Sequence, residues 1–142
     1  MKLDQTLVGA ALDLATNRWP AREAGAAALY TASGRILTSV FAESPNQSAC
    51  LCHETGAICE AHKLQEIVTA SVCVSREDVA APFVILPPCG ICCERLAFWG
   101  GEIEVAVPRR EDPSSWEMRR LKQLMPHYWF NGWIPARVRA GA

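Results

Sequence analysis

The sequence predicts a single α/β domain, in which helices cover the faces of a β-sheet. At 142 residues, with 50% of its side chains hydrophobic, the chain can bury one compact core but not two sizeable ones. Helical and strand-type hydrophobic periods alternate along it in the order α–β–β–α–β–α–β–(β)–α. No repeat, low-complexity tract or linker interrupts this order, so we expect residues 1–142 to form one domain.

The first half of the chain predicts a helix, a hairpin and a second helix. The first helix is expected over about residues 3–17, where apolar residues recur on one helical face: Leu3, Leu7, Ala10, Ala11 and Leu14. Two β-leaning runs within residues 26–41 are joined by Ser33-Gly34, a hairpin signal because glycine supplies the positive φ of a tight turn. After a polar loop at 43–50, a second helix is expected from about Cys52 to Ala70.

The second half predicts shorter elements. A short strand is expected at "SVCVS" (71–75), and a short helix from near Cys89 to about Trp99, before Gly100-Gly101. "EIEVAV" (102–107) alternates acidic and aliphatic residues, which is typical of a half-buried strand. Residues 112–126 should contain a short extended segment and a last helix that ends at Pro126.

Charge and cysteine content narrow the class of partner and the compartment. With 14 Lys+Arg against 15 Asp+Glu, the chain lacks the basic surface that nucleic acids or anionic membranes require, so we expect a small molecule as partner. No apolar run reaches the roughly 20 residues of a membrane span, and Asp4 and Asp13 stand where a signal peptide has its apolar core. We therefore expect a cytoplasmic protein, in which seven cysteines bind metal or lie in the core rather than form disulfides.

The cysteine motifs point to chemistry. Cys89 and Cys92 form a C-x-x-C, which alone fits a redox dithiol, half of a four-cysteine zinc site or two core thiols. Upstream, "CLCHE" adds Cys52 as a third candidate ligand and Glu54 two residues later. Three ligands are informative because catalytic zinc keeps its fourth position for water, and a nearby carboxylate such as Glu54 can take a proton from that water.

These motifs resemble the signature of a known enzyme family. "CHE" at 52–54 and "PCGIC" at 88–92 are similar to the motif of the cytidine deaminase family of zinc hydrolases, which includes the blasticidin S deaminases. Three further segments resemble the family's first hairpin, zinc helix and terminal helix: "GAAALYTASGRILTSV", "TGAICEAHK" and "RLKQLMPHYW". The resemblance implies a three-layer α/β/α domain with a mixed five-stranded sheet.

The resemblance also implies a reaction and roles for individual residues. The reaction is zinc-dependent hydrolytic deamination of a cytosine-type nucleoside, such as cytidine, deoxycytidine or a blasticidin S-like nucleoside, with release of ammonia. Cys52, Cys89 and Cys92 would hold Zn²⁺, and Glu54 would carry the proton from water to the ring nitrogen and then to the leaving ammonia. The backbone of His53 and the backbone around Pro87 would hold the polar edge of the base. The side chain of His53, in a slot that is usually alanine, would then be no ligand.

Two departures from the family bear on the sugar and on charge. Phe41-Ala42-Glu43 stands where the family has N-x-E, whose side chains grip the ribose hydroxyls, so Glu43 is kept and the asparagine is lost. Phe41 has two interpretations. It indicates a substrate with an altered sugar, a blasticidin-like nucleoside or a free base, or else it is a core residue of the strand. The family often has an arginine after the glutamate or the last cysteine. That arginine is missing here. Arg95, one helical turn beyond Cys92, either replaces its positive charge or is a solvated helix residue.

The C-terminal aromatics are similar to a family segment that stacks on the base, often in a neighbouring subunit's site. Trp129 aligns with that aromatic, although "HYWFNGW" (127–133) offers several. A homo-oligomer is therefore expected, a tetramer or else a dimer, since the family is commonly tetrameric.

Other functions stay open at this point. The chain could deaminate a free base or another amino-heterocycle, or be a non-catalytic zinc-containing nucleoside-binding protein. A thiol redox protein built on Cys89 and Cys92 would leave Cys52 and Glu54 unexplained. Of the remaining cysteines, we expect Cys59 and Cys73 to be core thiols and Cys50 to be a loop thiol.

Overall fold

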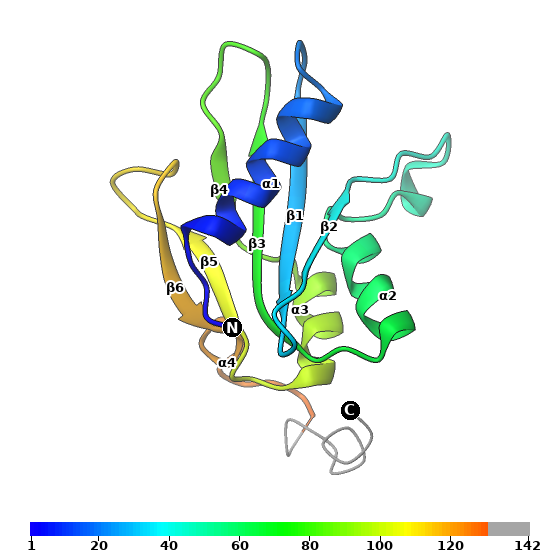
Figure 1. The fold of residues 1–142 in the computed structure, drawn as a ribbon, viewed down its shortest axis with the longest axis vertical. Coiled ribbons are helices and arrows are strands. Elements are labelled where there is room, and N and C mark those ends of the chain that lie inside the picture. The colour runs from blue at the N-terminus through cyan, green and yellow to red at the C-terminus, as the bar shows by residue number, and fades with distance from the viewer. Residues whose placement is uncertain (131–142) are drawn as a thin grey trace.

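A mixed sheet of six strands forms the centre of the computed structural model, which describes residues 1–130 (Figure 1). The strand order is β2-β1-β3-β5-β6, and β4 pairs with β3 beside this path. The β3 and β5 strands are parallel, and all other neighbours are antiparallel. The strands are β1 (Ala24–Thr31), β2 (Ile36–Val40), β3 (Val68–Arg76), β4 (Val84–Leu86), β5 (Glu104–Pro108) and β6 (Trp116–Arg120).

Helices cover both faces of this sheet. Helix α1 (Gln5–Arg18) packs on one face, and α2 (Thr55–Leu64) and α3 (Gly90–Leu96) pack on the other and stand next to each other (Figure 1). A short α4 (Leu121–Leu124) follows β6, and 3₁₀ turns occupy Gln47–Ala49 and Ala97–Trp99. The α/β class is confirmed. The sheet has six strands rather than five because Val84–Leu86 adds a short strand to β3. No helix within residues 1–130 has the length and apolar character to cross a bilayer.

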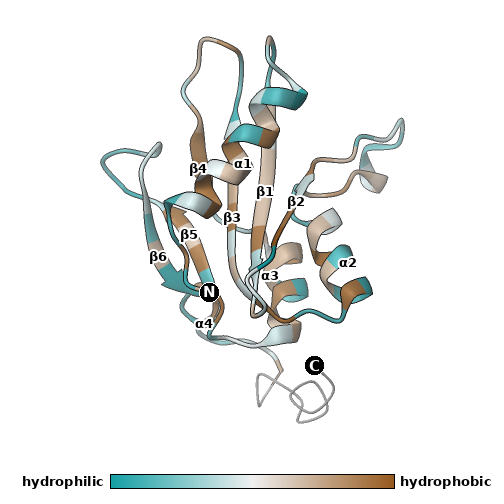
Figure 2. Ribbon diagram, in the orientation of Figure 1, coloured by the Kyte–Doolittle hydropathy of each residue, from teal (hydrophilic) through white to brown (hydrophobic). Residues whose placement is uncertain are grey.

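Strand β1 lies between the two clusters of buried residues that form the core, one on each face of the sheet, and all eight of its own residues are buried. Its alternate residues Ala26, Ala28 and Tyr30 join the core under α1, whereas Leu29 joins the core under α2 and α3. Figure 2 shows apolar residues along the central strands and hydrophilic residues on the outer strand β6. The many alanines of β1 leave room for helices to approach both faces closely.

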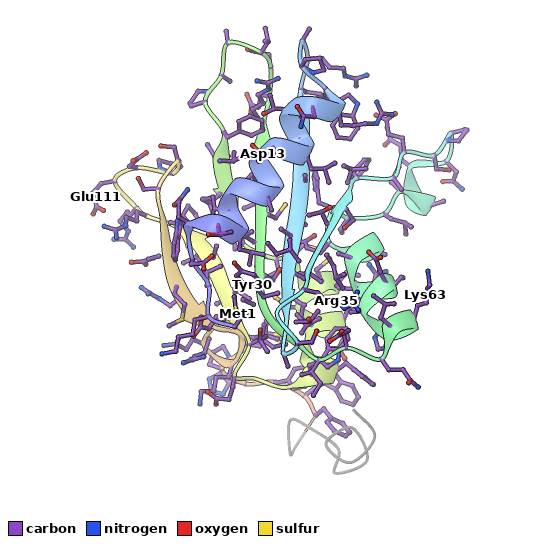
Figure 3. All side chains as sticks on the ribbon, in the orientation of Figure 1. Met1, Asp13, Tyr30, Arg35, Lys63 and Glu111 are labelled. Atoms are coloured by element: carbon purple, nitrogen blue, oxygen red, sulfur yellow. The ribbon has the colours of Figure 1, made fainter. Side chains whose placement is uncertain are left out.

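The start of α1 is joined to β1 by a partly buried polar contact. Asp4 caps the helix by accepting a hydrogen bond from the Leu7 backbone N–H at 3.0 Å, and it also accepts one from the Tyr30 hydroxyl at 3.0 Å. Tyr30, labelled in Figure 3, reaches Asp4 from the sheet beneath the helix. Burial first, and the Asp4 carboxylate second, raise the pKa of Tyr30 above its usual value.

The second helix is shorter than expected at both ends. It begins at Thr55, so Cys52 precedes it, and it ends at Leu64, where Gln65 adopts φ 56° and its N–H bonds the carbonyls of Ala61 and His62. Val68, expected on the helix, pairs with Thr31 as the first residue of β3. Its spacing fits a helical face by coincidence, and pairing with a central strand decides its conformation. The hairpin turn is confirmed, with Gly34 at φ 88°.

The left-handed conformation of Gln65 predicts a stabilising substitution. Glycine adopts this conformation without the steric penalty of a side chain, so Gln65→Gly should raise the free energy of unfolding by about 1 kcal/mol. Urea unfolding followed by circular dichroism measures the change. Gln65→Ala is the control and should not stabilise the protein. Equal effects of the two substitutions would contradict the assignment.

Candidate metal centre and substrate pocket

Three cysteine thiols meet where α2 and α3 begin. The Sγ atoms of Cys52, Cys89 and Cys92 all lie within 4.8 Å of one another, and those of Cys52 and Cys89 are 3.4 Å apart. Cys89 is the N-terminal cap of α3 and Cys92 lies in its first turn. Cys52 lies just before α2, directly after a β-bridge between Ala42 and Leu51 that returns the preceding loop to the end of β2. Two neighbouring helices on one face of the sheet therefore bring together residues that are 37 positions apart.

Glu54 is buried against this cluster. Its side chain is almost inaccessible, with 4% exposure for the residue, and its Oε2 accepts a hydrogen bond from the Cys92 thiol at 3.3 Å. Although Glu54 is the N-terminal cap of α2, its side chain makes no capping hydrogen bond. The expectation that Cys52 lies in the first helical turn is wrong, because Cys52 and Glu54 both precede Thr55. Glu54 contacts the Cys92 thiol from the turn that precedes α2.

Burial and negative charge act together on the thiols. Burial first, and the Glu54 carboxylate next, raise the pKa of Cys92 and also that of Cys73 on β3. Burial and the hydrogen bond with Cys89 raise the pKa of Cys52. Burial also opposes ionisation of Cys89, but hydrogen bonds that include the backbone N–H of Cys92 lower its pKa overall. A bound cation is the partner that would favour the charged forms of these groups.

The donor set fits zinc. Tetrahedral zinc with Zn–S distances of about 2.3 Å places its sulfur ligands roughly 3.8 Å apart, and the three Sγ atoms here lie within 4.8 Å of one another, with one pair at 3.4 Å. Three soft sulfur ligands select zinc over magnesium or calcium, which prefer oxygen. The cluster could therefore hold Zn²⁺ with one coordination position left over, beside the Glu54 carboxylate.

A pocket of about 260 Å³ is lined by His53, Phe41 and Glu43 together with several charged side chains, and none of the three thiols lines it. The Phe41 ring lies 5.6 Å from the His53 ring, between centroids, and is tilted by 49°. Phe41 is 37% exposed and follows the end of β2, so the interpretation of it as a strand core residue is wrong. Burial lowers the pKa of His53, and the charge of Glu54 opposes this change. Three of the five expected substrate residues therefore share one pocket.

The other two expected substrate residues lie elsewhere. Pro87 is exposed in the turn between β4 and Cys89, next to the centre in sequence. Trp129 is 74% exposed and donates its indole N–H to the Glu94 carboxylate on α3 at 3.0 Å, and it does not line the pocket with Phe41. Trp133, another aromatic of the same segment, lies outside the described residues.

The sequence left open whether Arg95 replaces the missing positive charge or is a solvated helix residue. It is half-buried and donates a hydrogen bond from Nη1 to Thr55 Oγ1 at 2.7 Å, so the interpretation of it as a solvated helix residue is wrong. The contact joins α3 to the first residue of α2, immediately after Glu54. A cation is thereby held where α3 contacts the start of α2, one residue beyond Glu54.

Sequence reasoning missed the residues that seat the "CHE" turn. The Ser39 hydroxyl on β2 donates a hydrogen bond to the His53 carbonyl. A Cβ at Gly56 would lie 2.8 Å from the Ser39 Cβ, so glycine is required for α2 to approach β2 this closely. Gly56 was the one feature of the sequence from which this close approach could have been predicted.

The remaining cysteines differ in part from expectation. Cys73 is buried as expected, whereas Cys59 is exposed on α2 rather than in the core. Cys50 follows the 3₁₀ turn of the polar loop and is half-buried. Cys93 is buried and its thiol donates to the Pro88 carbonyl at 3.3 Å. Burial, with the charges of Cys89 and Glu54, raises its pKa to about 11.

Solved structures of other proteins share this fold and part of this sequence. The cytidine deaminase of Bacillus anthracis is 41% identical, with 88% of each chain covered and a TM-score of 0.81. The chain belongs to the cytidine deaminase family. The cytidine deaminase of Mycobacterium tuberculosis is 26% identical over 91% of this chain and 99% of its own, with a TM-score of 0.67. That of Burkholderia pseudomallei, at 18% identity and a TM-score of 0.70, shares the fold. No protein-family model matches the sequence, and no curated protein matches it.

The thiol cluster predicts which cysteines determine metal affinity. Cys92→Ser should weaken zinc binding by at least about 100-fold, since it removes one of three protein ligands. Competition with a chromophoric chelator measures the affinity. Cys59→Ser, on the exposed side of α2, is the matched control and should bind zinc like the wild-type protein. Equal affinities of the two variants would contradict the assignment of the site.

The contact between α2 and α3 predicts a coupling between two side chains. Arg95→Met and Thr55→Val should each destabilise the protein, and a double-mutant cycle should give a coupling free energy of roughly 1–2 kcal/mol, as for a hydrogen bond to a charged donor. Chemical unfolding of the four proteins measures it. Strictly additive effects would show that the contact contributes nothing to stability.

Proposed function

We propose that this chain is a zinc-dependent aminohydrolase that removes the exocyclic amino group of a cytosine-type nucleoside and releases ammonia. The observation that carries the proposal is the buried Glu54 carboxylate, 3.3 Å from a thiol of a three-cysteine cluster that could hold zinc. Membership of the cytidine deaminase family supports the reaction class. Cytidine, deoxycytidine and blasticidin S-like nucleosides are the candidate substrates.

Cys52, Cys89 and Cys92 are the proposed zinc ligands. Bound zinc supplies a Lewis acid that lowers the pKa of a water molecule towards neutrality. The thiols arrive from the turn before α2 and from the first turn of α3, so the packing of two helices sets their spacing. Hydrogen bonds from backbone N–H groups at the start of α3 help Cys89 to ionise.

Glu54 is the proposed carrier of the proton. Its carboxylate takes a proton from the attacking water and passes it to the ring nitrogen beside the amine-bearing carbon. The remaining proton of that water, now on the hydroxyl added to the carbon, then goes to the amino group, the carbon–nitrogen bond breaks, and ammonia leaves while the ring keeps the oxygen as a carbonyl. Burial suits this role because it excludes bulk water, and neither oxygen of Glu54 is used to cap α2.

The remaining expected residues would orient the substrate. The backbone of His53 and the backbone near Pro87 would hold the polar edge of the base, and Glu43 would lie towards its substituent. Trp129 would stack on the base bound by another copy of the chain, which its 74% exposure and its ring contact with Phe130, 5.4 Å between centroids, support. We accordingly propose a homo-oligomer, a tetramer or else a dimer, that works in the cytoplasm and requires neither nucleic acid nor membrane.

One observation favours a second candidate within the same chemistry. Phe41 presents an apolar ring to the pocket at the position where hydroxyl recognition would need a polar side chain. A free base or another amino-heterocycle without ribose is therefore the alternative substrate. A protein that binds nucleosides through the same site without turnover is the outcome left if no ammonia is released.

Ammonia release tests the proposal. Zinc-loaded protein should release ammonia from at least one member of a panel of cytidine, deoxycytidine, cytosine, blasticidin S and amino-purines. Glu54→Gln should lower kcat by at least about 100-fold with zinc retained, because the amide cannot carry the proton. Glu60→Gln, on the exposed side of α2, is the control and should keep full activity. Unchanged activity of Glu54→Gln would contradict its role.

A further inference from the structure

An apolar groove of about 570 Å³ lies on the α1 face of the sheet. Three of its lining residues, Val8 of α1, Val74 of β3 and Ile85 of β4, belong to the core under α1. The three thiols lie beside the starts of α2 and α3, which pack on the other face, and neither they nor Glu54 lines the groove. The groove is therefore separate from the proposed reaction centre.

The groove lies where two strands share one edge of β3. Strand β5 pairs with β3 only at Ala70 and Ser71, and β4 pairs with β3 from Cys73 to Ser75. Beyond Val105, β5 pairs with β6 alone, so the β5–β6 hairpin is not part of the sheet edge that β4 occupies. Helix α1 crosses the sheet on this side, with β4 and the hairpin beside it (Figure 1). Residues of α1, β3, β4 and β6 line the hollow between these elements.

The walls of the groove are mainly apolar. Seven of its twelve lining residues have apolar side chains. Val8, Val74 and Ile85 are buried, whereas Phe83 and Trp116 are partly buried and present aromatic rings from different elements. Such a surface gains free energy when a flat apolar group covers it.

Arg109 gives the groove an unpaired positive charge. Its Nε donates a hydrogen bond to the Trp116 carbonyl at 3.1 Å, which holds the guanidinium beside the aromatic wall. No acidic side chain within residues 1–130 forms an ion pair with it. Glu117 also lines the groove, but Arg119 pairs with its carboxylate at 2.6 Å. The Nη groups of Arg109 are therefore the free charged donors of this site.

Hydrogen bonds fix the wall that carries Trp116. The indole N–H donates to Gln5 Oε1, at the start of α1, at 3.0 Å. The hydroxyls of Ser114 and Ser115, which also line the groove, both donate to the Asp112 carboxylate. A wall that is ordered in advance lowers the entropy cost of binding a ligand.

We propose that this groove is a second binding site, which takes a small aromatic carboxylate. The ring of the ligand lies against Trp116 and Phe83, and its carboxylate pairs with the guanidinium of Arg109. The volume of about 570 Å³ falls within the roughly 300–1,000 Å³ that is usual for small-molecule sites. Because the groove and the thiols lie on opposite faces of the sheet, the ligand and a substrate bind independently.

Titration with 2-naphthoate tests the site. Calorimetry of the zinc-loaded protein should show saturable binding of one 2-naphthoate per chain. Arg109→Gln should weaken this binding by at least about tenfold, because it removes the charged donor, and uncharged 2-naphthamide should bind the wild-type protein at least about tenfold more weakly than 2-naphthoate. Arg110→Gln is the matched control, since Arg110 is exposed and does not line the groove. Absence of saturable binding, equal effects of the two arginine variants, or equal affinities for the two compounds would overturn the proposal.

A substitution on β6 tests where the compound binds. Met118 lines the groove and is 38% exposed, so Met118→Glu adds a carboxylate there without a change to the core. This variant should bind 2-naphthoate at least about tenfold more weakly, through repulsion of like charges, and should keep the zinc affinity of the wild-type protein. Naphthoate binding that survives Met118→Glu would place the compound elsewhere, such as on the zinc, and would overturn the proposal. Failure to release ammonia would count against the proposed reaction alone.

Discussion

The burial of the Glu54 carboxylate among three thiols is the constraint on which the rest of the site depends. A buried carboxylate next to groups that themselves ionise to negative forms is unfavourable unless a cation compensates for them. The structure nevertheless holds the carboxylate and the three thiols together. The β-bridge between Ala42 and Leu51 positions Cys52 before α2, Cys89 and Cys92 lie at the start of α3, and both helices pack on the same face of the sheet. An arrangement of this kind is understandable if a divalent metal is its normal occupant.

The scaffold makes this convergence possible by using small residues where elements must approach. Strand β1 is buried on both faces and rich in alanine, so α1 can pack on one side and α2 and α3 on the other. Gly56 lets α2 approach Ser39, and Gly25 lets the imidazole of His53 lie on the strand. Close packing of the backbone thus fixes the turn that carries Cys52, His53 and Glu54, and the Arg95–Thr55 hydrogen bond joins that turn to α3.

Much of this could be predicted from the sequence, for reasons that are visible in particular residues. The order of elements followed from hydrophobic periodicity, the hairpin from Gly34, and the grouping of Cys52, Cys89 and Cys92 from motif spacing. The end of α2 could not be predicted. Val68 continues the apolar face of the helix in the sequence, but in the structure it pairs with Thr31 of β1 as part of a strand. The exposure of Cys59, the contact of Arg95 with Thr55 and the fit of His53 over Gly25 all depend on how distant segments pack. In the sequence such contacts are marked at most by a small or charged residue whose partner cannot be identified.

X-ray absorption spectroscopy at the zinc edge of the purified, zinc-loaded protein tests the central claim most directly. The account predicts three sulfur ligands at about 2.3 Å and one nitrogen or oxygen ligand at about 2.0–2.2 Å, the signature of an open three-thiolate site. Four sulfur ligands would indicate a closed structural site, and a shell without sulfur would place the metal elsewhere. Either result would contradict the assignment of Cys52, Cys89, Cys92 and Glu54 to one reaction centre.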